Sequence, residues 1–223
     1  MKLDARLSAC ADFIDENSVV ADIGTDHGYL PVYLVQNGIC KRAIASDIGV
    51  SPLESAKKNI EKYQLSDKIE AVLSDGLKNV PADGVSHIVI AGMGGETICS
   101  ILDSCQWVKN CVLVLQPMTR SELVRGWLFD NGFEISAEKA IIDEKFIYTV
   151  LKAVFTGKKN EYGQFETVVG GLDLSLPAER KYIEKKISQF EASASGKMKS
   201  RLSQEEALKD KEIADKLRKA LGE

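Results

Sequence analysis

The chain has 223 residues, of which 44% are hydrophobic and 28% are charged, and its formal net charge is −4. This composition is typical of a globular protein that is large enough for one α/β domain and a small appendage. No apolar run approaches the roughly 20 residues of a membrane helix, and the N-terminus lacks a secretory signal, so we expect a cytoplasmic protein without membrane contact.

The predicted elements begin with an amphipathic helix, in which Leu3, Leu7 and Ile14 recur at helical spacing. Short apolar runs that are rich in β-branched residues then predict five parallel strands, at 19–23, 43–47, 69–75, 87–92 and 111–117. The segments between them fit crossover helices. A further helix ends at Asn131-Gly132, and alternation over 134–144 and 146–155 predicts an antiparallel hairpin at one sheet edge. The pattern predicts a doubly wound, Rossmann-like α/β sheet, with ligands at the carboxyl ends of its strands.

The C-terminal part differs from the rest in composition and charge. From residue 177 onward the chain holds 12 Lys and Arg against 9 Asp and Glu, a balance of +3, whereas residues 1–176 hold 17 against 24, a balance of −7. Apolar residues at helical spacing and a capping box of Ser203 with Glu206 predict two helices that form an antiparallel hairpin, with residues 193–196 as an alternative turn. We therefore expect a domain at 1–160, a linker at 161–176 and a helical hairpin at 177–223.

The cysteines and histidines argue against a metal site. Five cysteines are present without a CxxC pair, and the whole chain has two histidines. We expect reduced thiols, mostly buried, and no bound metal.

The stretch Val19–Pro31, VVADIGTDHGYLP, runs from a predicted strand into a glycine turn of the kind that binds nucleotide cofactors. Dinucleotide sites have glycine at the second position of G-x-G-x-x-G, beside the pyrophosphate, whereas this chain has Asp26 there. Unit charges 4 Å apart interact by roughly 4 kcal/mol at an effective dielectric of 20, so this carboxylate disfavours NAD and FAD. It favours S-adenosylmethionine, whose sulfonium and ammonium groups would lie between Asp22 and Asp26.

The following strand ends carry groups that suit an adenosine. Asp47, after the second strand, could chelate the ribose hydroxyls, and Asp75, after the third, could accept a hydrogen bond from the adenine amino group. The fourth strand ends in Ala91–Gly95, AGMGG, where small residues let the backbone approach a flat ligand and Met93 supplies a polarizable face. The fifth ends in Gln116-Pro117. Helix capping by the aspartates is the alternative interpretation.

Taken in order, the segments VADIGTDHGYLP, ASDIGVSPLESAKKNI, SDGL, IVIAGMGGETI and LVLQP resemble the TrmK family of bacterial tRNA (adenine-N1)-methyltransferases. The resemblance covers residues 1 to about 176, and the hairpin is similar to the coiled-coil appendage of that family. It implies a class I methyltransferase that moves a methyl group from S-adenosylmethionine to N1 of adenosine 22 in tRNA. Family members often have Gln-Pro-Asn after the fifth strand, where this chain has Gln116-Pro117-Met118. A role for that amide in holding the target base is therefore unsupported by the sequence.

The resemblance, together with the chemistry of methyl transfer and the positions of basic residues, implies roles for particular residues. The catalytic pair would be Asp26 and His27, beside the positive charge that appears on the methylated base. The cofactor-binding set comprises Asp22, Gly24, Asp26, His27, Gly28, Asp47, Asp75, Gly76, Gly92, Met93 and Gly94. The substrate-binding set comprises Arg6, Gln116, Pro117, Arg125, Lys181, Lys185 and Lys186, with Lys197, Lys199 and Arg201 as further contacts to tRNA phosphates.

We expect tRNA as the partner and a monomeric enzyme. Two other functions remain open at this point. One is a methyltransferase of the same fold that acts on a small molecule or another RNA, which methyl-acceptor assays would distinguish. The other is a non-catalytic module that binds RNA or a protein partner, which a measurement of cofactor binding would distinguish.

Overall fold

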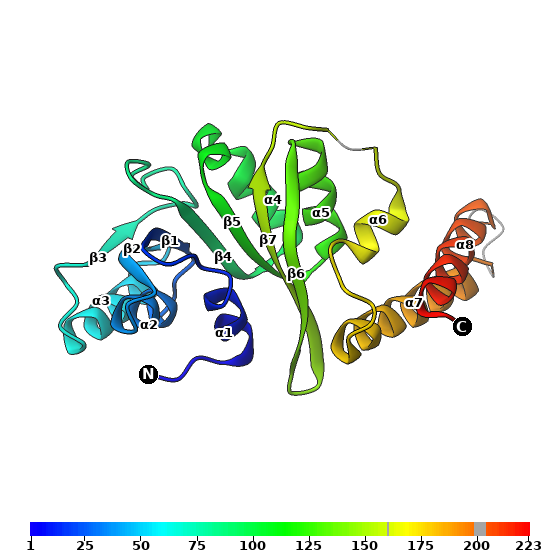
Figure 1. The fold of residues 1–223 in the computed structure, drawn as a ribbon, viewed down its shortest axis with the longest axis horizontal. Coiled ribbons are helices and arrows are strands. Elements are labelled where there is room, and N and C mark those ends of the chain that lie inside the picture. The colour runs from blue at the N-terminus through cyan, green and yellow to red at the C-terminus, as the bar shows by residue number, and fades with distance from the viewer. Residues whose placement is uncertain (160, 199–203) are drawn as a thin grey trace.

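The structure is a computed structural model that describes residues 1–159, 161–198 and 204–223. At its centre lies a seven-stranded sheet in the order β3-β2-β1-β4-β5-β7-β6 (Figure 1). The strands are β1 (Ser18–Ile23), β2 (Cys40–Asp47), β3 (Ile69–Leu73), β4 (His87–Gly94), β5 (Val112–Thr119), β6 (Phe133–Asp143) and β7 (Phe146–Phe155). β1 to β5 are parallel, and the β6–β7 hairpin is antiparallel. The predicted doubly wound sheet with a terminal hairpin is confirmed.

The direction of winding changes beside β1. The chain lays β2 and β3 outward on one side of β1 and then returns to place β4 on its other side. Asp22 of β1 is level with Ala45 of β2 and with Val89 of β4, so the carboxyl ends of these strands meet at one edge of the sheet. Crossover connections leave this point in opposite directions, which creates a ligand-binding crevice in open α/β sheets.

Helices cover both faces of the sheet, because side chains alternate between the two faces along each strand. Ile88 and Ile90 of β4 pack against α4 and α5 on one face, whereas Val89 packs in a cluster with α1, α2 and α3 on the other. This double burial explains why the strands read as continuous apolar runs. The helices are α1 (Ala5–Ala11), α2 (Tyr29–Gln36), α3 (Val50–Lys62), α4 (Gly95–Asp103), η1 (Gln106–Asn110, a 3₁₀-helix), α5 (Ser121–Asp130), α6 (Gln164–Val169), α7 (Pro177–Met198) and α8 (Gln204–Leu221).

The two C-terminal helices, α7 and α8, pack side by side as the predicted hairpin (Figure 1). Ile183 and Ile187 of α7 meet Ile213 and Leu217 of α8 in one buried cluster. The alternative turn at residues 193–196 is wrong, because α7 continues to Met198 and buries this segment's apolar face against α8. The predicted cap at residue 203 lies outside the described residues. A coiled-coil supercoil remains a prediction.

The segment 161–176, expected as a linker, is packed against its neighbours. It contains α6, and Val168 and Leu172 are buried in the same cluster as α7, α8 and Ile147 of β7. Three of the five cysteines, Cys10, Cys40 and Cys111, are buried, and all five are free thiols. None of the helices in the described parts of the chain has an apolar stretch of the length that crossing a bilayer requires.

Candidate active site

The glycine turn between β1 and α2 lies at the crevice beside β4. Gly24 and Gly28 have φ angles of +76° and +68°, in the left-handed region that favours glycine. The backbone N–H groups of Gly24 and Thr25 both donate to the carbonyl oxygen of Ser46, at 2.8 and 2.9 Å, which fixes the turn to β2. A Cβ atom at Gly24 would overlap Cε of Met93. The backbone conformation therefore favours glycine at this turn, and Met93 packs against the position of the missing side chain.

Asp22 is buried directly below this turn. Asp22 is 5% exposed, and Thr25 Oγ1 donates a hydrogen bond of 2.6 Å to Asp22 Oδ2. Burial raises the pKa of Asp22 to about 6; the Thr25 hydrogen bond opposes this shift, and the charge of Asp47 adds to it. A cationic group bound beside Asp22 would favour its ionised form.

Asp47 anchors the neighbouring loops at the end of β2. Its Oδ2 atom accepts the N–H of Asp26 at 3.2 Å, and its Oδ1 atom accepts the N–H of Gly49 at 2.8 Å. The N-cap residues of α2, α3 and α4 are Gly28, Gly49 and Gly94, and none of these three helices has a side-chain cap. Helix capping therefore does not explain Asp22 or Asp47, which precede α2 and α3.

A cavity of about 480 Å³ opens at the ends of β1 to β4. Ile48, Met93 and Ile101 supply its apolar walls, and Asp47 and Asp75 supply carboxylates. Asp75 also forms an ion pair with a lysine three residues further along the chain. Aliphatic walls suit the faces of an adenine ring, and a carboxylate accepts hydrogen bonds from ribose hydroxyls. This first cavity therefore fits the adenosine half of S-adenosylmethionine.

A second cavity, of about 350 Å³, adjoins the first at Gly24, which lines both. It lies toward α1 and α2 and brings together Asp22, Asp26 and His27. His27 Nε2 is 3.5 Å from Asp26 Oδ2, and the His27 ring stacks on Tyr29 with 5.2 Å between ring centroids. Its acidic lining fits the cationic methionine half of the predicted cofactor.

Gln116 was predicted to contact substrate, and this prediction is wrong. Its side chain is fully buried; Oε1 accepts the N–H of Gly92 at 2.9 Å, and Nε2 donates to the carbonyl oxygen of Pro117 at 3.2 Å. Both ends of the amide are thus used within the protein. Gln116 holds the glycine-rich end of β4 against β5, and Pro117 beside it is buried as well.

Arg125 was predicted to bind a tRNA phosphate, and this prediction is also wrong. The side chains of Arg125 and Glu138 are both 0% exposed, with Nη2 and Oε1 2.6 Å apart. Arg125 Nη1 also donates to the carbonyl oxygen of Thr167 at 2.8 Å, and its guanidinium lies over the Tyr182 ring at 5.8 Å. Arg125 therefore joins α5 to β6, α6 and α7.

The other basic residues predicted to contact tRNA differ in their availability. Lys181 and Lys185 are exposed on α7, away from both cavities. Lys199 and Arg201 lie outside the described residues. Ion pairs engage the remaining three, joining Arg6 to Asp4 and Asp143, Lys186 to Glu122, and Lys197 to Glu206 and Asp210.

The sequence analysis missed several residues that line the two cavities, and four of them have a clear role in the structure. Thr25 orients Asp22, Tyr29 stacks on His27, and Ile48 and Ile101 line the first cavity. Ile48 carried a usable signal in the sequence, because it is an apolar residue directly after an acidic strand end. In the structure it is 70% exposed. Ile101 carried none, since it falls on the apolar repeat of its own helix.

Comparison with known proteins shows the family of the chain. Residues 3–151 match the family model of a methyltransferase domain, which makes the chain a methyltransferase-fold protein. The tRNA (adenine(22)-N(1))-methyltransferase of Bacillus subtilis is 34% identical over 177 residues, which span 78% of this chain and 71% of that protein. The chain belongs to the tRNA (adenine(22)-N(1))-methyltransferase family.

Solved structures extend the likeness over nearly the whole chain. The Bacillus subtilis methyltransferase TrmK has a TM-score of 0.88 at 26% identity and covers 97% of this chain and 98% of its own. A Streptococcus pneumoniae protein in complex with S-adenosyl-L-methionine has a TM-score of 0.85 at 28% identity, over 97% and 99% of the two chains. TrmK of M. capricolum in complex with S-adenosylhomocysteine has a TM-score of 0.84 at 27% identity and covers 100% of this chain and 99% of its own.

Proposed function

We propose that the protein transfers the methyl group of S-adenosylmethionine to N1 of adenosine 22 in tRNA. The observation that carries this proposal is the pair of cavities that adjoin at Gly24, one suited to an adenosine and the other acidic. Relatives support the reaction: the Bacillus subtilis relative is named for it, and two structural neighbours hold S-adenosyl-L-methionine or S-adenosylhomocysteine.

Each half of the cofactor has its own set of residues in this proposal. Ile48, Met93 and Ile101 would hold the adenine ring, Asp75 would accept from its amino group, and Asp47 would accept from the ribose hydroxyls. Asp22 would hold the ammonium of the methionine half, whose charge would favour the ionised carboxylate. Gly24, between the two halves, permits close approach of the backbone.

The bound cofactor supplies an electrophilic methyl group on a sulfonium. N1 of adenine has a free lone pair, so the N–C bond forms as the S–C bond breaks, and no proton has to leave first. Positioning of the two reactants therefore supplies most of the rate. Positive charge passes from the sulfonium to the adenine ring of the target nucleotide. Asp26, with the adjacent His27, lines the second cavity and would stabilise this charge.

The hairpin at residues 177–223 is the proposed tRNA-binding part, and residues 1–160 form the proposed methyltransferase domain. A base stacked inside folded tRNA must be exposed before it can react, so the enzyme needs a grip on the phosphates nearby. Exposed Lys181 and Lys185 on α7 supply positive charge for that grip. Because its substrate is tRNA, we place the protein in the cytoplasm.

A methyl-transfer assay with two transcripts tests this proposal. Unmodified tRNA with adenosine at position 22 and the same tRNA with guanosine there are incubated with radiolabelled S-adenosylmethionine. We expect label on the adenosine transcript alone. Equal labelling of both transcripts would refute the assigned position. No labelling of either, by protein that binds the cofactor, would refute tRNA as the acceptor and favour a small molecule or another RNA.

A further inference from the structure

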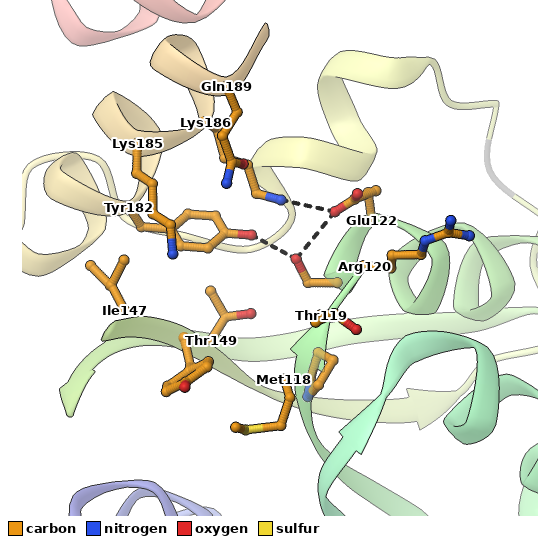
Figure 2. Close-up of a pocket in the computed structure, with 13 residues that line it drawn as sticks. Met118, Thr119, Arg120, Glu122, Ile147, Thr149, Tyr182, Lys185, Lys186 and Gln189 are labelled. Carbon is orange, nitrogen blue, oxygen red and sulfur yellow. Dashed lines mark hydrogen bonds and ion pairs between the residues drawn. The ribbon is translucent and has the colours of Figure 1, made fainter. Parts of the chain in front are cut away.

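A third cavity lies between the sheet and the C-terminal hairpin (Figure 2). Its volume is about 320 Å³, and four elements line it, among them the start of α5. Met118 and Thr119 come from the end of β5, Thr149 comes from β7, and Lys185 and Gln189 come from α7. In Figure 2, the side chains of Lys185 and Gln189 extend from α7 toward the strands opposite. Of the residues that line it, the proposed function uses Lys185 alone, as a general contact to tRNA phosphates.

Two contacts hold its walls together. Tyr182 OH of α7 lies 2.6 Å from Ser121 Oγ at the start of α5, and both residues are buried. One helical turn further along α7, Lys186 Nζ lies 3.0 Å from Glu122 Oε2 (Figure 2). The hairpin is thus fastened to the first turn of α5, and the cavity is a built feature of the fold.

The charges around the cavity leave one cation available. Arg120 is paired with Glu96, and Lys186 is paired with Glu122. Lys185 is exposed and has no carboxylate within 4.0 Å among residues 1–159, 161–198 and 204–223. The cavity therefore suits an anion at its α7 side, while Gln189 offers both a donor and an acceptor for a neutral polar group.

This cavity lies next to the proposed active site. In the pairing of β4 with β5, Pro117 is level with Met93 and Thr119 with Gly94. Adjacent strands lie about 4.8 Å apart, so the β5 wall of the third cavity stands directly behind the turn that lines the cofactor cavity. On the other side, Arg6 Nη1 of the second cavity lies 3.4 Å from Met118 Sδ.

We propose that the third cavity binds one nucleotide of the tRNA that neighbours the methylated adenosine. Lys185 contacts its phosphate, and Gln189 contacts its base. This inference rests on the proposed function. The proposed contact gives the hairpin a role in positioning the substrate. A nucleotide bound between α7 and the end of β5 would fix the RNA strand next to the base that must be exposed.

Three variants test the contact. Lys185→Ala and Gln189→Ala alter the cavity, and Lys211→Ala removes the same charge from an exposed position on α8 that does not line it. We expect Lys185→Ala to raise the KM for tRNA about tenfold and to flatten the slope of log affinity against log salt by about 0.7 to 0.9. Gln189→Ala should raise KM about threefold without changing the slope. All three variants should bind S-adenosylmethionine as the wild type does.

A second measurement identifies the nucleotide. Transcripts that each lack one base near position 22 are assayed with the wild type and with Gln189→Ala. We expect one position at which the missing base and the variant together raise KM no more than either does alone, as for two groups in contact. Additive effects at every position would overturn the inference, as would a Lys185→Ala variant that matches Lys211→Ala. Either result with an active wild type leaves the proposed function standing, whereas an inactive wild type refutes both.

Discussion

At the scale of single residues, Asp22 links stability to cofactor binding. Burial raises its pKa from an ordinary 3.8 to about 6, so the folded state holds this proton more tightly than the unfolded chain does. The folded state is therefore progressively destabilised as the pH rises from about 4 to about 7. The pKa difference of about two corresponds to a loss of about 3 kcal/mol in the free energy of unfolding.

Asp22→Asn removes this charge and keeps an acceptor for Thr25. We expect the free energy of unfolding in urea to exceed that of the wild type by about 2–3 kcal/mol at pH 8, and by about half as much at pH 5. Affinity for S-adenosylmethionine should nevertheless fall about tenfold or more, because the carboxylate proposed to face the ammonium is gone. Asp67→Asn, at an exposed position, is the control. A variant less stable than the wild type at pH 8 would contradict this explanation.

Asp47 gives the clearest test of the adenosine site. Asp47→Ala removes the proposed acceptor of the ribose hydroxyls and the anchor of two loop N–H groups. Since hydrogen bonds to a charged group contribute about 1.5–3 kcal/mol, we expect calorimetry to show at least tenfold weaker binding of S-adenosylmethionine. Asp83→Ala, on an exposed turn, should bind normally. Equal affinity of both variants would exclude Asp47 from the site.

At the scale of elements, the buried pair of Arg125 and Glu138 joins α5 to the β6–β7 hairpin. Arg125→Met leaves the Glu138 carboxylate buried without its partner, so we expect unfolding experiments to show a loss of about 3–5 kcal/mol. The double variant Arg125→Met/Glu138→Leu should recover much of that loss, because it removes both charges. Arg42→Met, at an exposed position on β2, should change little. A double variant no more stable than Arg125→Met would show that the charges are not the cause.

Elements were easier to predict from the sequence than the partners of their side chains. The five strand positions follow from apolar runs, because sheets covered on both faces exclude polar residues from their strands. Arg125 was misassigned because its partner Glu138 belongs to another element, and sequence spacing does not reveal such a contact. Gln116 was misassigned for the same reason, as its amide bonds to Gly92 on the adjacent strand.

At the scale of the whole molecule, charge is divided between the two ends of the chain. Residues 1–176 carry −7 and residues 177–223 carry +3, so the hairpin is the part suited to a polyanion. We expect tRNA binding to weaken with salt at a log–log slope of about −2 or steeper, from two or more phosphate contacts. Binding of S-adenosylmethionine in the partly enclosed cavities should change much less. A flat salt dependence for tRNA would exclude a hairpin grip on phosphates.

The sequence predicted the acidic strand ends and the glycine turns of the site, because each is carried by one residue at one turn. It could not predict that the cavities adjoin at Gly24, since that depends on how the ends of β1 and β4 meet. Nor could it predict the third cavity, which forms only where α7 docks on α5.

Product mapping is the most direct test of the proposed reaction. Unmodified tRNA is incubated with the protein and S-adenosylmethionine, digested with nuclease and analysed by mass spectrometry. We predict one added methyl group, on the fragment that contains nucleotide 22, and 1-methyladenosine as the methylated nucleoside after complete digestion. Methylation at another nucleotide or another ring atom, or none at all from protein shown to bind the cofactor, would contradict the proposed function.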